Sequence, residues 1–160
     1  MFFKIFIFLL VFIKSSYSHE LRPAIANLNI YEKDNIINAS LTIRLNLEAI
    51  IAELDMSHSN TKVSKESDQY ESLRNMSAVD LLEQFNSKII NLQKKIYLTS
   101  VSSNYSLTLL NIDIPEVGNT DIIRDTIINF DIKNIKDEDL KFSWDKNLGS
   151  IILRVNSKNN

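Results

Sequence analysis

Residues 37–47 read INASLTIRLNL, and this stretch decides the fold class. Apolar and polar side chains alternate along its whole length, with alanine, leucine and isoleucine at the odd positions. Successive side chains of a β-strand point to opposite faces, so the alternation predicts a strand with one buried face and one wet face.

The residues before this strand repeat the alternation. Residues 24–30 place Ala24, Ala26, Leu28 and Ile30 on one face and asparagines on the other. Between the two strands, Lys33-Asp34-Asn35 has the side chains of a tight turn. The sequence therefore predicts a β-hairpin.

After this strand the apolar spacing changes from two residues to three or four. The positions that follow the new spacing are Leu47, Ile50, Ile51 and Leu54. They lie at i, i+3, i+4 and i+7, which predicts one apolar face of a short helix. Residues 57–67 are polar and rich in serine, so we expect a loop there.

A second helix is predicted from residue 78 onward. Ser77 is a capping residue, and Asp80 three positions later gives a weaker form of the capping box. The apolar stripe of this helix consists of Ala78, Leu82, Phe85, Ile89 and Leu92.

The remainder of the chain has strand character. The predicted strands are residues 96–101, 105–114, 122–132, 140–144 and 150–155. Both glycines, Gly118 and Gly149, fall between strands, as does Pro115. We expect a mainly β fold, namely an antiparallel immunoglobulin-like β-sandwich with a helical insert at about residues 47–93, after the second strand.

The first 18 residues have the three parts of a secretory signal peptide. Lys4 supplies positive charge, residues 5–13 are continuously apolar, and Ser16-Tyr17-Ser18 offers small residues for cleavage. The apolar run is shorter than the roughly 20 residues that span a bilayer. We expect one exported domain, residues 19–160, that is periplasmic or extracellular; an uncleaved membrane anchor is the alternative.

Composition narrows the classes of partner. Removal of residues 1–18 takes away Lys4 and Lys14, which leaves 16 basic groups of the 18 against 20 acidic ones, a net charge of −4. No basic run suited to phosphates is present, so nucleic acid is not expected as a partner. The chain has no cysteine, so its core must stabilise it without disulfides. No apolar stretch after residue 18 is long enough to span a membrane.

Several segments together resemble the extracytoplasmic N-terminal domain of HupE/UreJ-type membrane proteins. These segments are residues 19–24 (HELRPA), 46–49 (NLEA), 70–74 (YESLR), 112–118 (IDIPEVG), Arg124, 142–144 (FSW), 148–149 (LG) and 151–154 (IILR). The resemblance covers almost the whole of residues 19–160 in the same order. It implies a link to nickel or cobalt uptake, and a membrane protein of a metal-uptake system as partner. The family's multi-helix membrane portion is not found up to Asn160, so transport itself is not implied. A separate membrane chain, a stand-alone domain and a truncated gene all stay open.

His19 is the candidate metal ligand that the predicted cleavage creates. As the first residue, it would offer its amino group and its imidazole to one ion, and such nitrogen ligands suit Cu²⁺ and Ni²⁺; the resemblance adds cobalt. Glu20 could add an oxygen, and His58 is the only other histidine. The alternative is that His19 follows the cleavage site for processing reasons and that His58 is a solvated loop residue.

No arrangement of residues predicts catalysis. The chain has no G-x-S-x-G motif and no glycine-rich phosphate loop. The carboxylates of Asp113, Glu116 and Asp121 are interpreted as a solvated turn, and Arg124-Asp125 as part of a wet face. We expect a non-enzymatic domain accessory to metal handling, or else a structural domain that docks on a membrane protein through an edge strand or the helical insert.

The amino-terminal chelate can be tested directly. Protein that begins at His19 should bind Ni²⁺ or Cu²⁺ more tightly than protein with one extra residue before it, because the extra residue moves the free amino group away from the imidazole. Isothermal titration calorimetry of the two forms measures the difference. Equal affinities would rule out the chelate.

Overall fold

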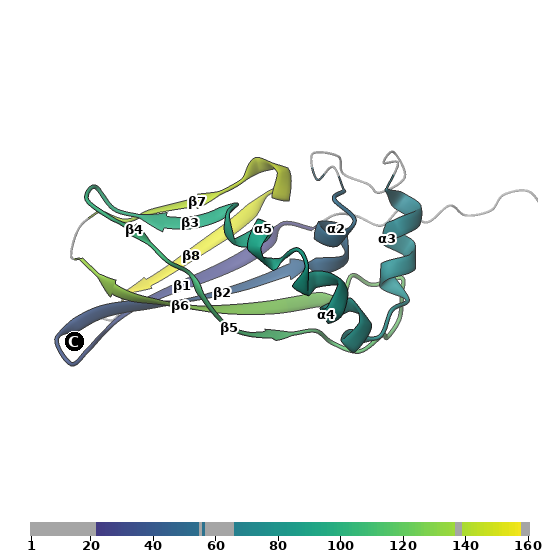
Figure 1. The fold of residues 1–160 in the computed structure, drawn as a ribbon, viewed down its shortest axis with the longest axis horizontal. Helices are drawn as coiled ribbons and strands as arrows, with labels where there is room; N and C mark the ends of the chain where they lie inside the picture. The colour runs from purple at the N-terminus through teal and green to yellow at the C-terminus, as the bar shows by residue number, and fades with distance from the viewer. Residues whose placement is uncertain (1–21, 55, 57–65, 137–138, 158–160) are drawn as a thin grey trace, which may run out of the picture.

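The computed structural model describes residues 22–54, 56, 66–136 and 139–157 of the chain (Figure 1). It is mainly β and contains two sheets. The five-stranded sheet has the order β5 (Thr108–Asp113), β6 (Asp125–Ile135), β2 (Ile36–Asn46), β1 (Ala24–Lys33), β8 (Ile151–Ser157). The three-stranded sheet has the order β4 (Asn104–Tyr105), β3 (Ile96–Thr99), β7 (Lys141–Trp144).

All described α-helices follow β2 and precede β3, where the sequence predicted a helical insert. They are α2 (Leu47–Ile51), α3 (Ser67–Arg74), α4 (Ala78–Asn86) and α5 (Ile89–Gln93). A short 3₁₀ helix, η2 (Lys146–Leu148), separates β7 from β8. Figure 1 shows α2, α3 and α4 at one end of the five-stranded sheet, opposite the end where β1 turns into β2. Within the described ranges, no helix has the length and apolar character needed to cross a membrane.

The β1–β2 hairpin forms as the alternating pattern predicts. Its turn residues Asp34 and Asn35 have φ angles of 56° and 59°. Two successive positive φ angles match the twist of paired strands, and short Asp and Asn side chains tolerate this conformation. Ile25 pairs with Arg44 at one end of the hairpin.

Apolar side chains cross the buried face of the five-stranded sheet in two rows. One row is Leu28, Leu41, Phe130 and Leu109, and the other is Ala26, Ile43, Ile128 and Ile112. Ile96 and Leu98 of the smaller sheet belong to the same core. Each fully buried Leu, Ile or Phe contributes about 1.5–3 kcal/mol to folding, so these rows supply much of the stability of a chain without disulfides.

The predicted strand 105–114 is in fact divided between the two sheets. Asn104–Tyr105 pairs with β3, whereas Thr108–Asp113 pairs with β6. Polar and apolar residues alternate without a break from Tyr105 to Leu109, so the pattern does not reveal that the chain changes sheets after Tyr105.

The expectation of a wholly antiparallel arrangement is wrong at one edge. β8 pairs with β1 in parallel, with Ala24 opposite Ile151 and Leu28 opposite Val155. A parallel pair requires a long connection, and here nearly the whole described chain lies between the two strands. β8 is an edge strand, and its Val155 is 55% exposed.

The helical insert differs from the prediction in two details. Residues 67–74 form α3, which was not predicted, because only Tyr70 and Leu73 supply its apolar contacts. The predicted helix from residue 78 is interrupted after Asn86, and α5 starts at Ile89. The Ser77 cap is confirmed, since its hydroxyl accepts a hydrogen bond from the backbone N–H of Asp80 at 3.2 Å.

The leucine that α4 buries also differs from the predicted one. Leu81 is fully buried with Phe85, whereas the predicted Leu82 is only half-buried. Leu92 is buried on α5, as predicted.

Gly149 tests how tightly the η2–β8 turn is packed. Its φ is +81°, and a Cβ atom there would lie 2.8 Å from Cβ of Met56. Gly149→Ala should therefore lower the free energy of unfolding by about 1–3 kcal/mol, because it adds both backbone strain and overpacking. Chemical denaturation followed by circular dichroism measures the change.

Gly118→Ala is the matched control. Apart from Gly118 itself and its two neighbours in the chain, no atom lies within 4 Å of the position that its Cβ would occupy. We expect a change between zero and a gain of about 1 kcal/mol, from the lower entropy of the unfolded chain. Equal losses for the two variants would contradict the packing described here.

Candidate functional site

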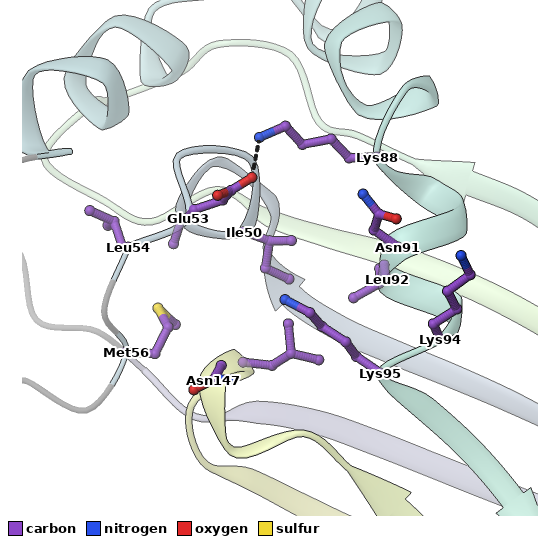
Figure 2. A pocket seen from close by; sticks show the side chains of 12 residues that line it. Ile50, Glu53, Leu54, Met56, Lys88, Asn91, Leu92, Lys94, Lys95 and Asn147 are labelled. Atoms are coloured by element: carbon purple, nitrogen blue, oxygen red, sulfur yellow. Dashed lines mark hydrogen bonds and ion pairs between the residues drawn. The ribbon is translucent and has the colours of Figure 1, made fainter.

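A cavity of about 590 Å³ lies between the end of α2, the helix α5 and the η2 turn (Figure 2). Three segments that are distant in sequence form its wall: residues 49–54 with Met56, residues 88–95, and residues 147–148. Its volume falls within the range of about 300–1,000 Å³ that is typical of small-molecule sites. This cavity is the candidate functional site.

The floor of the cavity is apolar. The apolar side chains that line it are Ala49, Ile50, Leu54, Met56, Leu92 and Leu148. Ala49, Leu54, Leu92 and Leu148 are buried, and Ile50 and Met56 pack partly buried against the same core. The floor is therefore an extension of the hydrophobic core that reaches the surface.

One face of the α5 segment supplies most of the polar rim. Lys88, Asn91, Leu92 and Lys95 are spaced i, i+3, i+4 and i+7, so they share one side of the helical turns. Lys94 lies beside them at the edge of the cavity. Figure 2 shows the Lys95 side chain extending across the cavity toward Ile50.

Glu53 holds the opposite rim in an unusual backbone conformation. It follows the C-cap of α2 with φ of +56°. The N–H groups of Glu53 and Leu54 donate to the carbonyl oxygens of Ile50 and Ala49 at 3.2 and 3.0 Å, which is a Schellman ending. Glycine is the usual residue at such a position because it has no Cβ, so glutamate there carries a conformational cost.

Lys88 connects this strained residue to α5. Its Nζ donates to Glu53 Oε1 at 2.8 Å and to the carbonyl oxygen of Ile51 at 2.8 Å. The hydrogen bond from Lys88, followed by its charge, lowers the pKa of the Glu53 carboxyl, and the charge of Lys95 acts in the same direction. Glu53 and Lys88 are therefore a charged pair that spans the cavity rim.

The remaining lysines of the rim have no such partner. In the part of the chain that the structure describes, neither Lys94 nor Lys95 forms an ion pair. Among the described residues, the charged groups that line the cavity are three lysines and one glutamate, which makes the rim electropositive.

A buried ion pair lies behind α2 and fixes the insert on the sheet. Arg124 Nε donates to Glu48 Oε1 at 2.6 Å, and the two side chains are 8% and 2% exposed. The guanidinium also donates to the carbonyl oxygens of Leu73, Met76 and Pro115 at 3.1–3.2 Å. The interpretation of Arg124 as part of a wet face is therefore wrong, because four acceptors from three segments enclose its charge. Asp125 beside it is exposed.

A second set of polar contacts continues this network to the start of α2. The Asn46 Nδ2 atom donates to the Tyr70 hydroxyl at 2.8 Å, and its Oδ1 accepts from the N–H of Ala49 at 3.1 Å, which caps α2. The Arg74 guanidinium lies 5.4 Å from the centroid of the Tyr70 ring and donates to the carbonyl oxygen of Ile122 at 3.4 Å. Burial raises the pKa of the Tyr70 hydroxyl, which keeps it neutral as a hydrogen-bonding group. The network is a support for α2 and not part of the cavity lining.

The metal ligands that the sequence predicted are not among the residues that form these sites. His19, Glu20 and His58 lie outside the described residues, so the metal site remains a prediction. Among the described residues, no group of three histidine, cysteine, aspartate or glutamate side chains is arranged to hold a metal ion. Glu116, from the acidic turn, accepts a hydrogen bond from the N–H of Ala78 at 3.2 Å and so anchors the start of α4.

The cavity itself was missed in the sequence. The signal was present in the spacing of Lys88, Asn91, Leu92 and Lys95, but a lysine-rich helix face is usually a solvated one. The opposite wall comes from residues 49–54, Met56 and residues 147–148, which no local pattern brings together.

Comparisons with known proteins add no relative. No protein-family model matches the chain, and neither a curated protein nor a solved structure is significantly similar to it.

The buried ion pair should be essential for stability. Arg124→Met leaves the Glu48 carboxylate buried without its cation, which costs about 3–5 kcal/mol. Arg44→Met is the matched control: Arg44 lies 3.9 Å from Asp125, and both side chains are about half exposed, at 49% and 46%. An exposed pair is worth less than about 1 kcal/mol.

Urea denaturation of the two variants measures the difference. The double variant Arg124→Met, Glu48→Leu should recover part of the loss, because it removes the uncompensated charge as well. Losses of similar size for Arg124→Met and Arg44→Met would show that the pair does not hold the insert.

Proposed function

We propose that this protein is a non-enzymatic, exported binding domain and that the cavity between α2, α5 and η2 holds a small ligand. The observation that carries the proposal is the form of the cavity. It joins an apolar floor, continuous with the core, to a few polar groups at the rim. Small-molecule sites combine apolar walls with a small number of placed polar groups in the same way.

The chemistry of the lining favours binding over catalysis. In the described part of the chain, the titratable groups that line the cavity are Lys88, Lys94, Lys95 and Glu53. The one carboxylate is hydrogen-bonded to Lys88 and has a lowered pKa, which opposes a role as a proton donor near neutral pH. Such a set can hold and orient a ligand by charge and by hydrogen bonds.

The export and family parts of the proposal rest on the sequence. Residues 1–18 have the pattern of a signal peptide. The resemblance to the HupE/UreJ extracytoplasmic domain rests on the sequence segments quoted above, and Glu48, Arg74, Pro115 and Arg124 belong to those segments. An immunoglobulin-like arrangement belongs to the same proposal, and the single core that the two sheets share supports it.

Docking of a partner at the edge of the sheet is a second candidate function. β8 is an edge strand of seven residues, and its exposed apolar side chains are Ile152, Leu153 and Val155. Native proteins usually protect an edge of this kind, so an apolar edge strand favours addition of a strand from a partner. On this alternative the cavity would bind nothing.

A neutral apolar dye separates the two functions. Nile Red should bind the protein at one molecule per chain, with a rise in fluorescence. Asn91→Trp should weaken its binding at least tenfold, because the exposed Asn91 lines the cavity and an indole there would fill its mouth.

Gln84→Trp is the matched control. Gln84 is also an exposed helical amide, but it lies on α4 and does not line the cavity. Its variant should bind the dye like the unmodified protein. Equal dye binding by the two variants, or none by the unmodified protein, would overturn the proposed cavity function.

A further inference from the structure

We propose that the ligand of this cavity is an amphiphilic monocarboxylate: an apolar chain of medium length that lies on the floor, with a carboxylate held by Lys95 and with Lys94 adding positive charge at the rim. This inference rests on the cavity function proposed above and names the chemical class of its ligand. Three observations carry it: the charge of the rim, the reach of Lys95 and the apolar floor.

The positive charge of the rim favours an anionic ligand. Lys88 is already bound to Glu53 and to the carbonyl oxygen of Ile51. Lys94 and Lys95 stand on the same wall with no ion pair to any described residue. Each of these ammonium groups adds positive potential at the rim, and this potential attracts an anion. A cationic ligand is disfavoured for the same reason.

Lys95 lies where it can hold the head group of a ligand on the floor. Figure 2 shows its side chain crossing the cavity from α5 toward Ile50, whereas Lys94 stands at the rim. The charge of Lys95 also acts on Glu53 across the cavity. The backbone N–H of Lys95 donates to the carbonyl oxygen of Leu92 at 2.9 Å, so the helical turn fixes where this side chain starts.

The apolar floor favours a ligand that has an apolar part over an inorganic anion. A small hydrated ion would leave the apolar surface that the floor still exposes, chiefly that of Ile50 and Met56, in contact with water, and the gain from burial would be lost. The cavity of about 590 Å³ has the volume of roughly twenty water molecules at ~30 Å³ each, which accommodates a medium-length chain together with its carboxylate. Flexible methylene groups also suit a floor that Met56 completes, because methionine adapts its shape to its neighbours.

Four probes test the inference by isothermal titration calorimetry at low salt. Octanoate carries both parts of the proposed ligand, 1-octanol only the chain, acetate only the head group, and octylammonium the opposite charge. Octanoate should bind about tenfold more tightly than 1-octanol or octylammonium, and acetate should bind at least a hundredfold more weakly. Added sodium chloride should weaken the binding of octanoate and leave that of 1-octanol unchanged.

Lysine variants assign the head-group site. Lys94→Gln with Lys95→Gln should reduce the affinity for octanoate about tenfold, to that for 1-octanol, without change in the affinity for 1-octanol. Lys133→Gln with Lys141→Gln is the charge-matched control, because both lysines are exposed on strands and neither lines the cavity. It should bind octanoate within twofold of the unmodified protein.

The failures of the two proposals are distinguishable. Equal binding of octanoate and 1-octanol, unchanged in the Lys94 and Lys95 variant, would overturn the carboxylate head group but leave the cavity function in place. Acetate as tight as octanoate would overturn the apolar chain, and tighter octylammonium would overturn the charge. Absence of binding by octanoate, 1-octanol and Nile Red alike would overturn both proposals.

Discussion

The arrangement of the helical insert depends on the buried contact between Arg124 and Glu48. The pair joins the first helix after β2 to the residue just before β6, so it connects the insert to the central strands of the larger sheet. Removal of two charges from water is expensive, and the guanidinium compensates by donating to three carbonyl groups as well. Those of Leu73 and Met76 lie at and just beyond the end of α3, where a cation is favoured by the helix dipole. One side chain thereby fixes α2, α3 and the Pro115 loop together.

The position of α2 in turn defines the cavity. Asn46 caps the helix at its start, and the Schellman ending at Glu53 stops it after a few residues, so that Leu54 returns to the core. The chain accepts a left-handed glutamate where glycine would cost less. In return the carboxylate reaches Lys88 and connects α2 to α5 across the cavity rim. Backbone strain of this kind is concentrated at functional sites, which agrees with the placement of the cavity.

The sequence predicted those parts of the fold that a local pattern encodes. Alternation defined β1 and β2, and the Ser77 cap defined the start of α4, because both depend on neighbouring residues. The division of residues 105–114 between two sheets and the parallel pairing of β8 with β1 depend on tertiary contacts, which no local period records. Arg124 shows the same limit: beside Asp125 it resembles a surface pair, and only the fold brings Glu48 to it.

The candidate site shows why one sequence pattern of a helix is compatible with either a solvated surface or the wall of a cavity. Lysines at i and i+7 with a leucine between them are typical of a helix that buries one residue and keeps its charges in water. Here Leu92 lies beside the apolar side chains of Ile50, Leu54 and Leu148, so the same lysines border an apolar cavity instead of open solvent. In a chain with more acidic than basic groups, this concentration of positive charge at one cavity is local. The electrostatic potential that a ligand meets at the cavity therefore depends on these lysines and not on the net charge of the protein. This potential, together with the apolar floor, favours an anion that also has an apolar surface.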